Sequence, residues 1–318
     1  MGNTDKLPLK VVYGDFTLGV HGEGFHYIFS YAQGGLESIV KNGLEWLYRC
    51  PKPTFWRALT DNDRGSKFHI KSGSWLAADM FMDCVEIEVM VDGESQGKPC
   101  APVNNRYKKD IYAKEVMVRF GYRVITSPET SVEVVYIVNE DGSIDVKVHY
   151  HGKKGLPQLP VFGMRFIMPT LADKYCYEGL SGETYPDRKE GAVKGVYEIN
   201  DLSLTPYLVP QECGMHMDTK WVEVTRHTSL DQSRKNISSQ TLRIEQGNEP
   251  FAFSCLPYTA EEIENATHHE ELPPARRTVL CIYGAVRGVG GIDSWGSDVE
   301  SEYHISGEED ILYEFKIC

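Results

Sequence analysis

The stretch Val116-Met-Val-Arg-Phe-Gly-Tyr-Arg-Val124 decides the class of fold that we expect. Its even-numbered positions are all apolar, whereas arginines occupy positions 119 and 123. Successive side chains of an extended backbone point to opposite faces, so this alternation predicts a strand with one buried face. The same period recurs over residues 144–150 and 311–317. We therefore expect the chain to be built mainly from half-buried strands.

Turn-forming residue pairs separate the predicted strands. Asp141-Gly142 lies between residues 132–138 and 144–150, an arrangement typical of a tight β-hairpin. Similar pairs occur at Asn42-Gly43 and Ser306-Gly307. The strands follow one another without the helices of 10–15 residues that a parallel βαβ sheet requires. The sequence therefore predicts a sandwich of antiparallel sheets.

Two short segments carry helical signals. Thr259-Ala-Glu-Glu262 has the pattern of a capping box, which predicts a helix over residues 260–267. A second helix is expected over residues 74–81, where Trp75 and two later apolar residues share a helical face. We find no internal repeat and no low-complexity linker. Residues 1–318 are therefore expected to form a single domain.

The composition excludes several classes of partner. The 318 residues include 33 Lys and Arg but 46 Asp and Glu, which gives a formal charge of −13. Such a charge argues against nucleic acid and anionic membrane surfaces as partners. No apolar run approaches the roughly 18 residues that span a bilayer, and the first six residues lack an apolar signal core. We expect a cytoplasmic protein, and free thiols for its eight scattered cysteines.

Several short motifs resemble catalytic or metal sites but depart from the required pattern. Asp61-Asn-Asp-Arg-Gly65 begins like a calcium loop, but its glycine comes one place early and Ser72 replaces the final glutamate. His268-His-Glu-Glu271 offers four ligands that point apart on either a strand or a helix. Gly288-Val-Gly-Gly291 lacks the βαβ unit of a dinucleotide site. We therefore predict that none of these motifs forms a catalytic, metal or cofactor site.

Four dense clusters of aromatic, charged and glycine residues stand out instead. They are Thr54-Phe-Trp-Arg-Ala-Leu-Thr-Asp-Asn-Asp-Arg-Gly65, Gly182-Glu-Thr-Tyr-Pro-Asp-Arg188, Thr205-Pro-Tyr-Leu-Val-Pro-Gln-Glu-Cys-Gly214 and Gly288-Val-Gly-Gly-Ile-Asp-Ser-Trp295. In this order and over most of the chain, they resemble the C-terminal β-sandwich domain of the large bacterial β-galactosidases. The chain is similar throughout to the separately encoded small subunit of the heterodimeric enzymes of lactic acid bacteria.

The resemblance implies an all-β fold, a large antiparallel supersandwich of the galactose-mutarotase-like type with one or two short helices. It also implies a non-catalytic role in a retaining β-galactosidase that hydrolyses terminal β-D-galactosides such as lactose. The nucleophile and the acid/base glutamate would lie on the large subunit, and the present chain would complete its active-site pocket. Mg²⁺ and Na⁺ are implied for the assembled enzyme, with their ligands mostly on the large chain.

The resemblance assigns roles to individual residues. Trp295 would form an aromatic platform under the sugar next to the cleaved galactose, since an indole offers a flat apolar surface and one N–H donor. Gly290 and Gly291 would let its loop reach a neighbouring cleft, and Asp293 and Ser294 would shape the loop by hydrogen bonds to the backbone. Structural or interfacial ion pairs, buried enough to need partners, are expected for Arg57, Asp61, Asp63, Arg188 and Glu212.

Two alternatives remain open at this stage. A stand-alone aldose epimerase of the same fold needs a general base and acid on one concave sheet, for which His149, His151 and His216 are available. A carbohydrate-binding protein would use aromatic rings such as Trp295 and Trp221. Half of an obligate assembly should also expose an apolar patch of more than a few hundred Å².

Overall fold

The computed structural model describes residues 8–101, 111–231, 233, 237–293 and 295–318, and their strands form three antiparallel sheets. The largest sheet has ten strands in the order β15 (Lys194–Ile199), β14 (Lys174–Leu180), β17 (Trp221–Arg226), β18 (Gln240–Gln246), β21 (Ile311–Ile317), β12 (Ile144–His151), β11 (Thr130–Asn139), β10 (Glu115–Val124), β7 (Asp83–Val91) and β8 (Glu94–Gly97).

Two smaller sheets complete the fold. One has six strands in the order β5 (Leu44–Glu45), β4 (Gly35–Lys41), β3 (Phe25–Ser30), β2 (Thr17–Gly22), β1 (Leu9–Tyr13) and β9 (Ile111–Ala113). The other has five strands in the order β16 (Met215–Thr219), β19 (Phe251–Leu256), β20 (Thr278–Val286), β13 (Val161–Met168) and β6 (Arg49–Thr54).

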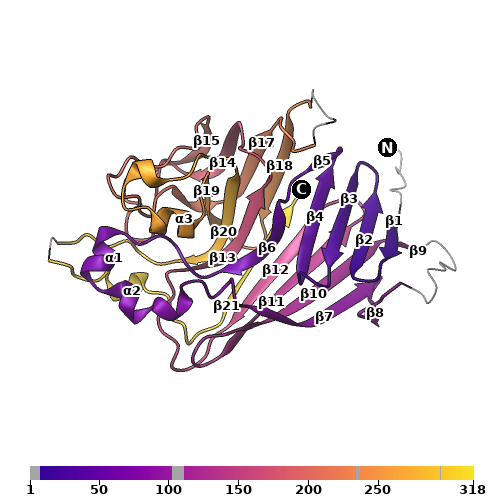
Figure 1. Cartoon of the computed structure of the whole chain (residues 1–318), viewed down its shortest axis with the longest axis horizontal. Helices are drawn as coiled ribbons and strands as arrows, with labels where there is room; N and C mark the ends of the chain where they lie inside the picture. Colours follow the sequence, from indigo (N-terminus) through magenta and orange to yellow (C-terminus); the bar gives the residue numbers. More distant parts are fainter. Residues whose placement is uncertain (1–7, 102–110, 232, 234–236, 294) are drawn as a thin grey trace.

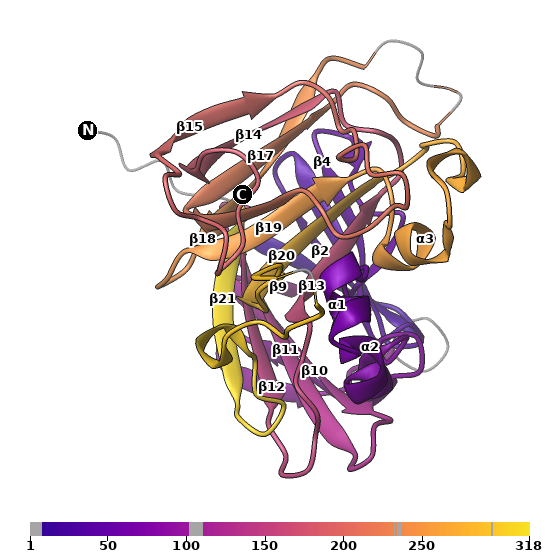
Figure 2. The same cartoon turned by 90° about the vertical axis from the view of Figure 1, so that its left-hand side faces the viewer.

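The ten-stranded sheet forms one layer, and the two smaller sheets pack side by side against it (Figures 1 and 2). Aromatic rings connect the layers at both places. Phe29 of β3 contacts Tyr136 of β11 at a centroid distance of 5.7 Å, and Phe166 of β13 contacts Phe315 of β21 at 6.0 Å. One cluster of buried side chains therefore runs through all three sheets. The predicted all-β class is confirmed.

The predicted hairpin is also confirmed. β11 and β12 pair from Ser131 opposite His151 to Val138 opposite Ile144, so Asp141-Gly142 lies in the turn. Gly142 has a φ of +78°, a backbone conformation that glycine adopts without a steric penalty. The apolar side chains at alternate positions of β11 are buried, because they face the second layer.

Three short α-helices occur among the described residues, one more than the upper number that we expected. They are α1 (Asp61–Gly65), α2 (Phe68–Lys71) and α3 (Ala260–Asn265). The capping box that predicts α3 is present: Thr259 Oγ1 accepts from Glu262 N, and the Glu262 carboxylate accepts from Thr259 N. The helix predicted over residues 74–81 is wrong. Only the 3₁₀ turn η1 (Gly73–Trp75) forms there, because Ala77 has a φ of +60° that a right-handed helix does not accommodate.

Three further findings concern the cysteines, the length of the helices and the remaining 3₁₀ turns. All eight cysteines are free thiols, as expected. Among the residues that the structure describes, none of the helices has the length and apolar character needed to cross a bilayer. Two other 3₁₀ turns, η3 (His269–Glu271) and η4 (Ser301–Tyr303), lie in the connections on either side of β20.

Candidate functional site

The candidate site is the loop between β20 and β21, which carries Trp295. This loop extends beyond α1 and α2 at one end of the molecule (Figure 1). The Trp295 side chain is 91% exposed, the largest exposed fraction among the large hydrophobic residues of the described chain. Its position agrees with the predicted platform, although the platform role itself stays a prediction.

The first part of the loop is held by side chains from two other segments. The Asp187 carboxylate accepts hydrogen bonds from Val289 N at 2.9 Å and from Gly290 N at 2.7 Å. Arg188 Nη2 donates to the carbonyl oxygen of Gly290, and Asn62 Nδ2 donates to that of Val289 at 3.0 Å. The backbone before Trp295 is therefore fixed by four side-chain contacts.

Glycines allow the loop to lie close to its neighbours. Gly291 has a φ of +83°, and a Cβ atom there would lie 2.9 Å from Asn62 Nδ2. Gly296 also has a φ of +83°, and a Cβ atom there would lie 2.8 Å from the carbonyl oxygen of Gly65 in α1. Both positions therefore need glycine for the backbone angle and for the space. Gly290 has a φ of +71°.

Asp293 shapes the loop tip. Its Oδ1 atom accepts from Trp295 N at 2.9 Å and from Ser297 N at 3.2 Å, while Oδ2 accepts from the Ser297 hydroxyl. Hydrogen bonds from the Ser297 side chain and from these two N–H groups lower the pKa of Asp293. Ser294, which we expected to contribute, lies outside the described residues. The backbone of Trp295 and Ser297 is therefore tied to one carboxylate.

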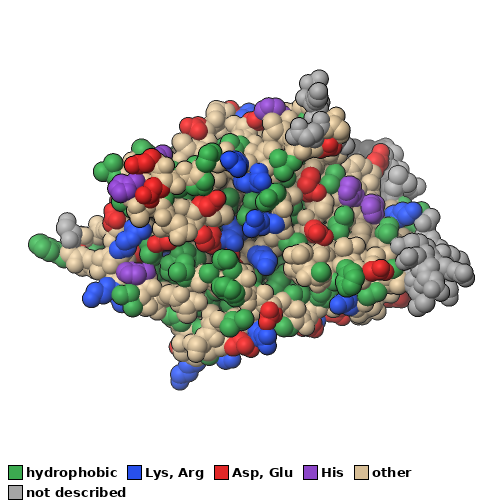
Figure 3. All heavy atoms as spheres, viewed as in Figure 1, with side chains coloured by type: hydrophobic (Ala, Val, Ile, Leu, Met, Phe, Trp, Pro, Cys, Tyr) green, Lys and Arg blue, Asp and Glu red, His purple; other side chains and the backbone are tan. Residues whose placement is uncertain are grey.

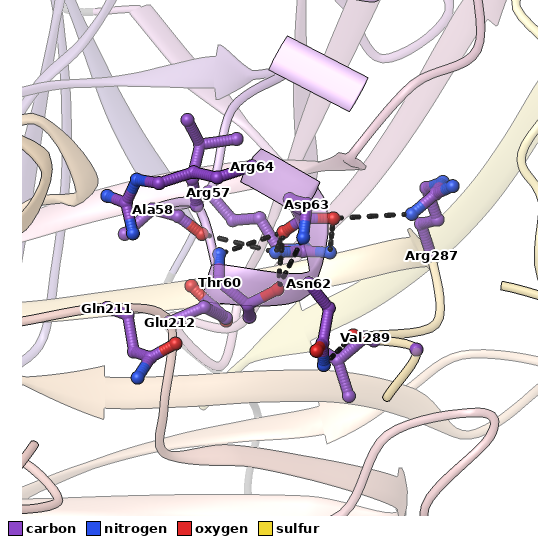
Figure 4. A network of polar contacts seen from close by, with 12 residues as sticks. Arg57, Ala58, Thr60, Asn62, Asp63, Arg64, Gln211, Glu212, Arg287 and Val289 are labelled. Carbon is purple, nitrogen blue, oxygen red and sulfur yellow. Dashed lines mark hydrogen bonds and ion pairs between the residues drawn. The ribbon is translucent and has the colours of Figure 1, made fainter. Parts of the chain in front are cut away.

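A buried ionic network lies beneath the loop (Figure 4). Arg57 donates to both carboxylate oxygens of Asp63, at 2.6 and 3.2 Å, and Arg287 Nη1 lies 3.4 Å from Asp63 Oδ1. The side chains of Arg57, Asp63 and Arg287 are each 1% exposed. Arg57 Nη2 also donates to the carbonyl oxygen of Gly288 at 3.2 Å. The network therefore connects the start of α1 to the first residue of the loop.

Asp63 is at the same time a helix-capping residue. Its carboxylate accepts from Thr60 N at 2.9 Å, and Thr60 Oγ1 accepts from Asp63 N at 3.1 Å, which completes a capping box on α1. Arg287 in turn binds Asp298 further along the loop. The start and the middle of the loop are therefore connected through the buried Arg287.

Glu212 lies next to this network and is buried. Burial raises the pKa of Glu212 to about 8, although the charge of Arg57 opposes the shift. Tyr185 Oη lies 3.5 Å from Glu212 Oε1. The charges of Arg57 and Arg287 are already balanced by Asp63 and Asp298, so a protonated Glu212 leaves the buried cluster neutral.

The other two expected ion-pair residues lie at the surface. Asp61 is exposed, and its Oδ1 atom lies 3.5 Å from Arg64 Nη1. Arg188 is also exposed, although its guanidinium donates to the loop backbone. In the segment that begins like a calcium loop, the Asp63 carboxylate accepts from Arg57, and the Asn62 amide donates to the loop backbone. Arg57, Asp63 and Glu212 are therefore buried, whereas Asp61 and Arg188 lie at the surface. The role of these five residues at an interface stays a prediction.

Comparison with known proteins places this site in a family. Residues 21–317 match the family described as the beta galactosidase small chain. The chain belongs to the β-galactosidase small-chain family. It is 57% identical over 317 residues to a β-galactosidase small subunit from Latilactobacillus sakei, with 100% of this chain and 99% of the relative covered.

Longer relatives of this small-chain family member are also known. β-Galactosidases from Halalkalibacterium halodurans and Streptococcus thermophilus are 36% and 32% identical to it. The matches cover 97% and 98% of this chain but only 28% of each relative. The chain thus spans just over a quarter of the length of these enzymes.

Solved structures show a weaker likeness to the small chain. A galactose mutarotase-like protein from Lactobacillus casei aligns with a TM-score of 0.42 and 11% identity, covering 95% of this chain and 99% of the other. A putative aldose 1-epimerase from Escherichia coli K12 gives 0.43 and 10%, covering 98% of each chain. Likeness at this level carries no argument about activity.

The three histidines considered for an epimerase do not all lie at one place in this small chain. His216 is buried between the layers, where its ring contacts Tyr177 and Phe253, and burial lowers its pKa to about 4. His149 and His151 flank the buried Tyr150 on β12 and therefore lie on the outer face of the ten-stranded sheet. A shared catalytic pocket is not formed by these three residues.

The ring of Trp221 is also unsuited to stacking on a sugar. The Arg243 guanidinium lies 4.2 Å from the centroid of the ring and covers one face. Trp221 Nε1 donates to Glu178 Oε2 at 2.9 Å, so its donor is already used. Among the rings considered for a carbohydrate-binding protein, Trp295 is by far the more accessible.

Sequence reasoning missed several residues that position the Trp295 loop. Arg287 and Gly296 stand directly outside the glycine-rich motif that we quoted, and Asn62 and Asp187 stand inside quoted clusters without an assigned role. A glycine that follows a tryptophan in a loop was a usable signal, since glycine permits a positive φ. The charge of Arg287, directly before Gly288, was a second usable signal.

Proposed function

We propose that this chain is the non-catalytic subunit of a β-galactosidase and completes the active-site pocket of a catalytic large subunit. Terminal β-D-galactosides such as lactose are the proposed substrates, and the catalytic glutamates are assigned to the large subunit. The support is the match to a named small subunit over its whole length, and to longer β-galactosidases over just over a quarter of theirs. The proposed partner would supply the part of these longer enzymes that the chain does not match.

The observation that carries the proposal is the exposed indole of Trp295 on a loop with a fixed backbone. An exposed tryptophan leaves a large apolar surface in water, which is unfavourable unless a ligand or partner covers it. A pyranose ring has an apolar C–H face that matches an indole, and its hydroxyl groups can accept from the indole N–H. Because Asp187 and Asp293 fix the backbone on either side, the ring would be offered in a defined place.

Exposed apolar side chains close to the loop support a large-subunit contact at the same end. Ile70 of α2 is 69% exposed, Leu76 shortly after this helix is 50% exposed, and apolar surface is visible in this region in Figure 3. Lys71 of α2 lies 3.4 Å from Asp298 of the loop. The proposed contact surface is therefore adjacent to the proposed sugar platform.

The subunit role is tested by reconstitution with a β-galactosidase large subunit. The purified chain alone should not hydrolyse a nitrophenyl galactoside, and addition of the large subunit should restore activity. Enzyme-like turnover by the chain alone would show that the catalytic groups are its own. Interconversion of galactose anomers by the chain alone would support the epimerase instead.

The platform role is tested in the reconstituted enzyme. Trp295→Ala should weaken the binding of glucose, the acceptor-side sugar, by about 1–3 kcal/mol, the typical cost of losing one stacked ring. Trp295→Phe should retain part of the affinity, because it keeps an aromatic face. Trp221→Ala is the matched control and should leave glucose inhibition unchanged. Equal affinities for the Trp295→Ala and wild-type enzymes would contradict the platform.

The ions expected for the assembled enzyme, Mg²⁺ and Na⁺, are assigned to the large subunit. The side chains of Asp61, Asn62 and Asp63 support this assignment, because they are directed to different partners. Chelation of Mg²⁺ should inactivate the reconstituted enzyme, and the activity should return when Mg²⁺ is added back.

A further inference from the structure

Two histidines and one aspartate converge on the outer face of the ten-stranded sheet. His149 and His151 are two residues apart on β12, so both side chains point away from the second layer, whereas Tyr150 between them is buried. Asp310 directly precedes β21, the strand that pairs with β12 through His149 and Leu312. The three side chains therefore come from two adjacent strands and meet at one end of this pair.

Their ligand atoms lie close together. Asp310 Oδ2 lies 2.8 Å from His149 Nε2 and 3.9 Å from His151 Nδ1, and the two imidazole centroids are 3.8 Å apart. One nitrogen of each ring and one carboxylate oxygen all lie within 4.8 Å of one another. Tetrahedral zinc with ligand distances of roughly 2.0–2.1 Å separates its ligand atoms by about 3.3 Å. The two distances to Asp310 lie on either side of that value.

The surrounding groups favour a bound cation. The second oxygen of Asp310 accepts from Gly152 N at 2.8 Å, which orients the carboxylate in the way that a second coordination shell does. Glu133 of β11 lies opposite His149, and its Oε1 atom is 3.9 Å from His151 Nε2.

We propose that His149, His151 and Asp310 form a surface site for one divalent transition-metal ion, for which Zn²⁺ is the best-suited probe. Imidazole nitrogens with a carboxylate select zinc over the hard cations Mg²⁺ and Ca²⁺, which prefer oxygen ligands only. Water completes the coordination.

The chain supplies a matched control in a second histidine pair. His21 of β2 and His26 of β3 face each other with ring centroids 5.5 Å apart. Burial, His26 and the positive charge of Lys10 lower the pKa of His21, so this pair has a cationic neighbour where the proposed site has a carboxylate. A metal that required only two adjacent imidazoles would bind both pairs.

The test is a calorimetric titration of the full, metal-free chain with ZnCl₂ at neutral pH. We expect one ion per chain in the wild type and in His26→Gln, and loss of this binding in His149→Gln and in His151→Gln. Asp310→Asn should weaken the affinity on the order of tenfold or more, as losses around a metal site do. Circular dichroism of each variant checks that these surface substitutions leave the fold unchanged.

Two outcomes would overturn the proposal. One is a titration of the wild type without saturable binding. The other is a full equivalent of bound zinc in both His149→Gln and His151→Gln, which would assign the ion to other groups such as the exposed thiol of Cys100. Because the isolated chain is used, the result does not depend on the proposed β-galactosidase role.

Discussion

The charge of Asp63 holds together two buried arginines, and its removal is the sharpest test of the network beneath the Trp295 loop. In Asp63→Asn the side-chain volume is retained, and the amide oxygen can still accept from Thr60 N. The negative charge that faces Arg57 and Arg287 is lost. Both arginine side chains are 1% exposed, so water cannot solvate their charges in place of the carboxylate.

The expected loss of unfolding free energy follows from these contacts. Removing one partner of a buried ion pair costs about 3–5 kcal/mol, because a charge is left in the interior without compensation. Asp298 still contacts Arg287, and Glu212 can ionise next to Arg57. We therefore expect the lower part of the range, about 3–4 kcal/mol.

The measurement is equilibrium unfolding in urea at pH 7, followed by circular dichroism. The control is Asp61→Asn, two residues earlier in the same helix, whose side chain is 77% exposed. Its effect should stay within about 0.5 kcal/mol, as for most surface substitutions. An Asp63→Asn variant within about 1 kcal/mol of the wild type would refute the reasoning, because the buried arginines would then not need this carboxylate.

Two further predictions concern the same region. Burial raises the pKa of Glu212 to about 8, so between about pH 4.3 and that value the folded chain retains a proton that the unfolded chain has released. The free energy of unfolding should therefore fall as the pH rises through this interval, and Glu212→Gln should flatten the slope in urea unfolding; an identical slope would contradict the assignment. Gly296→Ala should destabilise the chain more than Gly93→Ala, by at least about 1 kcal/mol. Both glycines have a positive φ, but only the new Cβ at position 296 meets the backbone of Gly65, so equal losses in urea unfolding would argue against that close approach.

Local patterns were enough to predict β10, β11, β12 and β21. The alternation in β10, β12 and β21 reflects burial of one face, which depends only on the residues of the strand itself. The order of the strands was not predictable, because it places β12 next to β21. No turn signal links two strands so far apart in the chain.

The helices show where a local pattern misleads. Thr60 and Asp63 have the same capping-box spacing as Thr259 and Glu262, yet we compared the first pair only with a calcium loop and missed α1. The apolar spacing after Ser74 was helical, but it arises because Trp75 is buried against Phe55 at a centroid distance of 5.4 Å. The packing of one large ring thus produced an apolar spacing that resembles the buried face of a helix.

The site was predictable in its parts but not in its contacts. Charged residues at positions 57 and 63 were expected in ion pairs, and the glycines before Trp295 were expected to shape a loop. That Arg287 shares Asp63 with Arg57, and that Asp187 binds the loop backbone, depends on tertiary approach. The pair His149 and His151 was visible as two imidazoles on one strand face, but Asp310 joins them only in the folded sheet.

The attachment of the Trp295 loop has a consequence for the order of events during synthesis. The guanidinium of Arg57 bonds to a carbonyl 231 residues further along the chain. Contacts of such long sequence separation are slow to form, since the intervening loop must close first. The Trp295 loop thus reaches its final position only after Gly288 has been synthesised and has met Arg57. A partner that contacts this tryptophan would therefore bind only chains in which these two distant segments have already packed together.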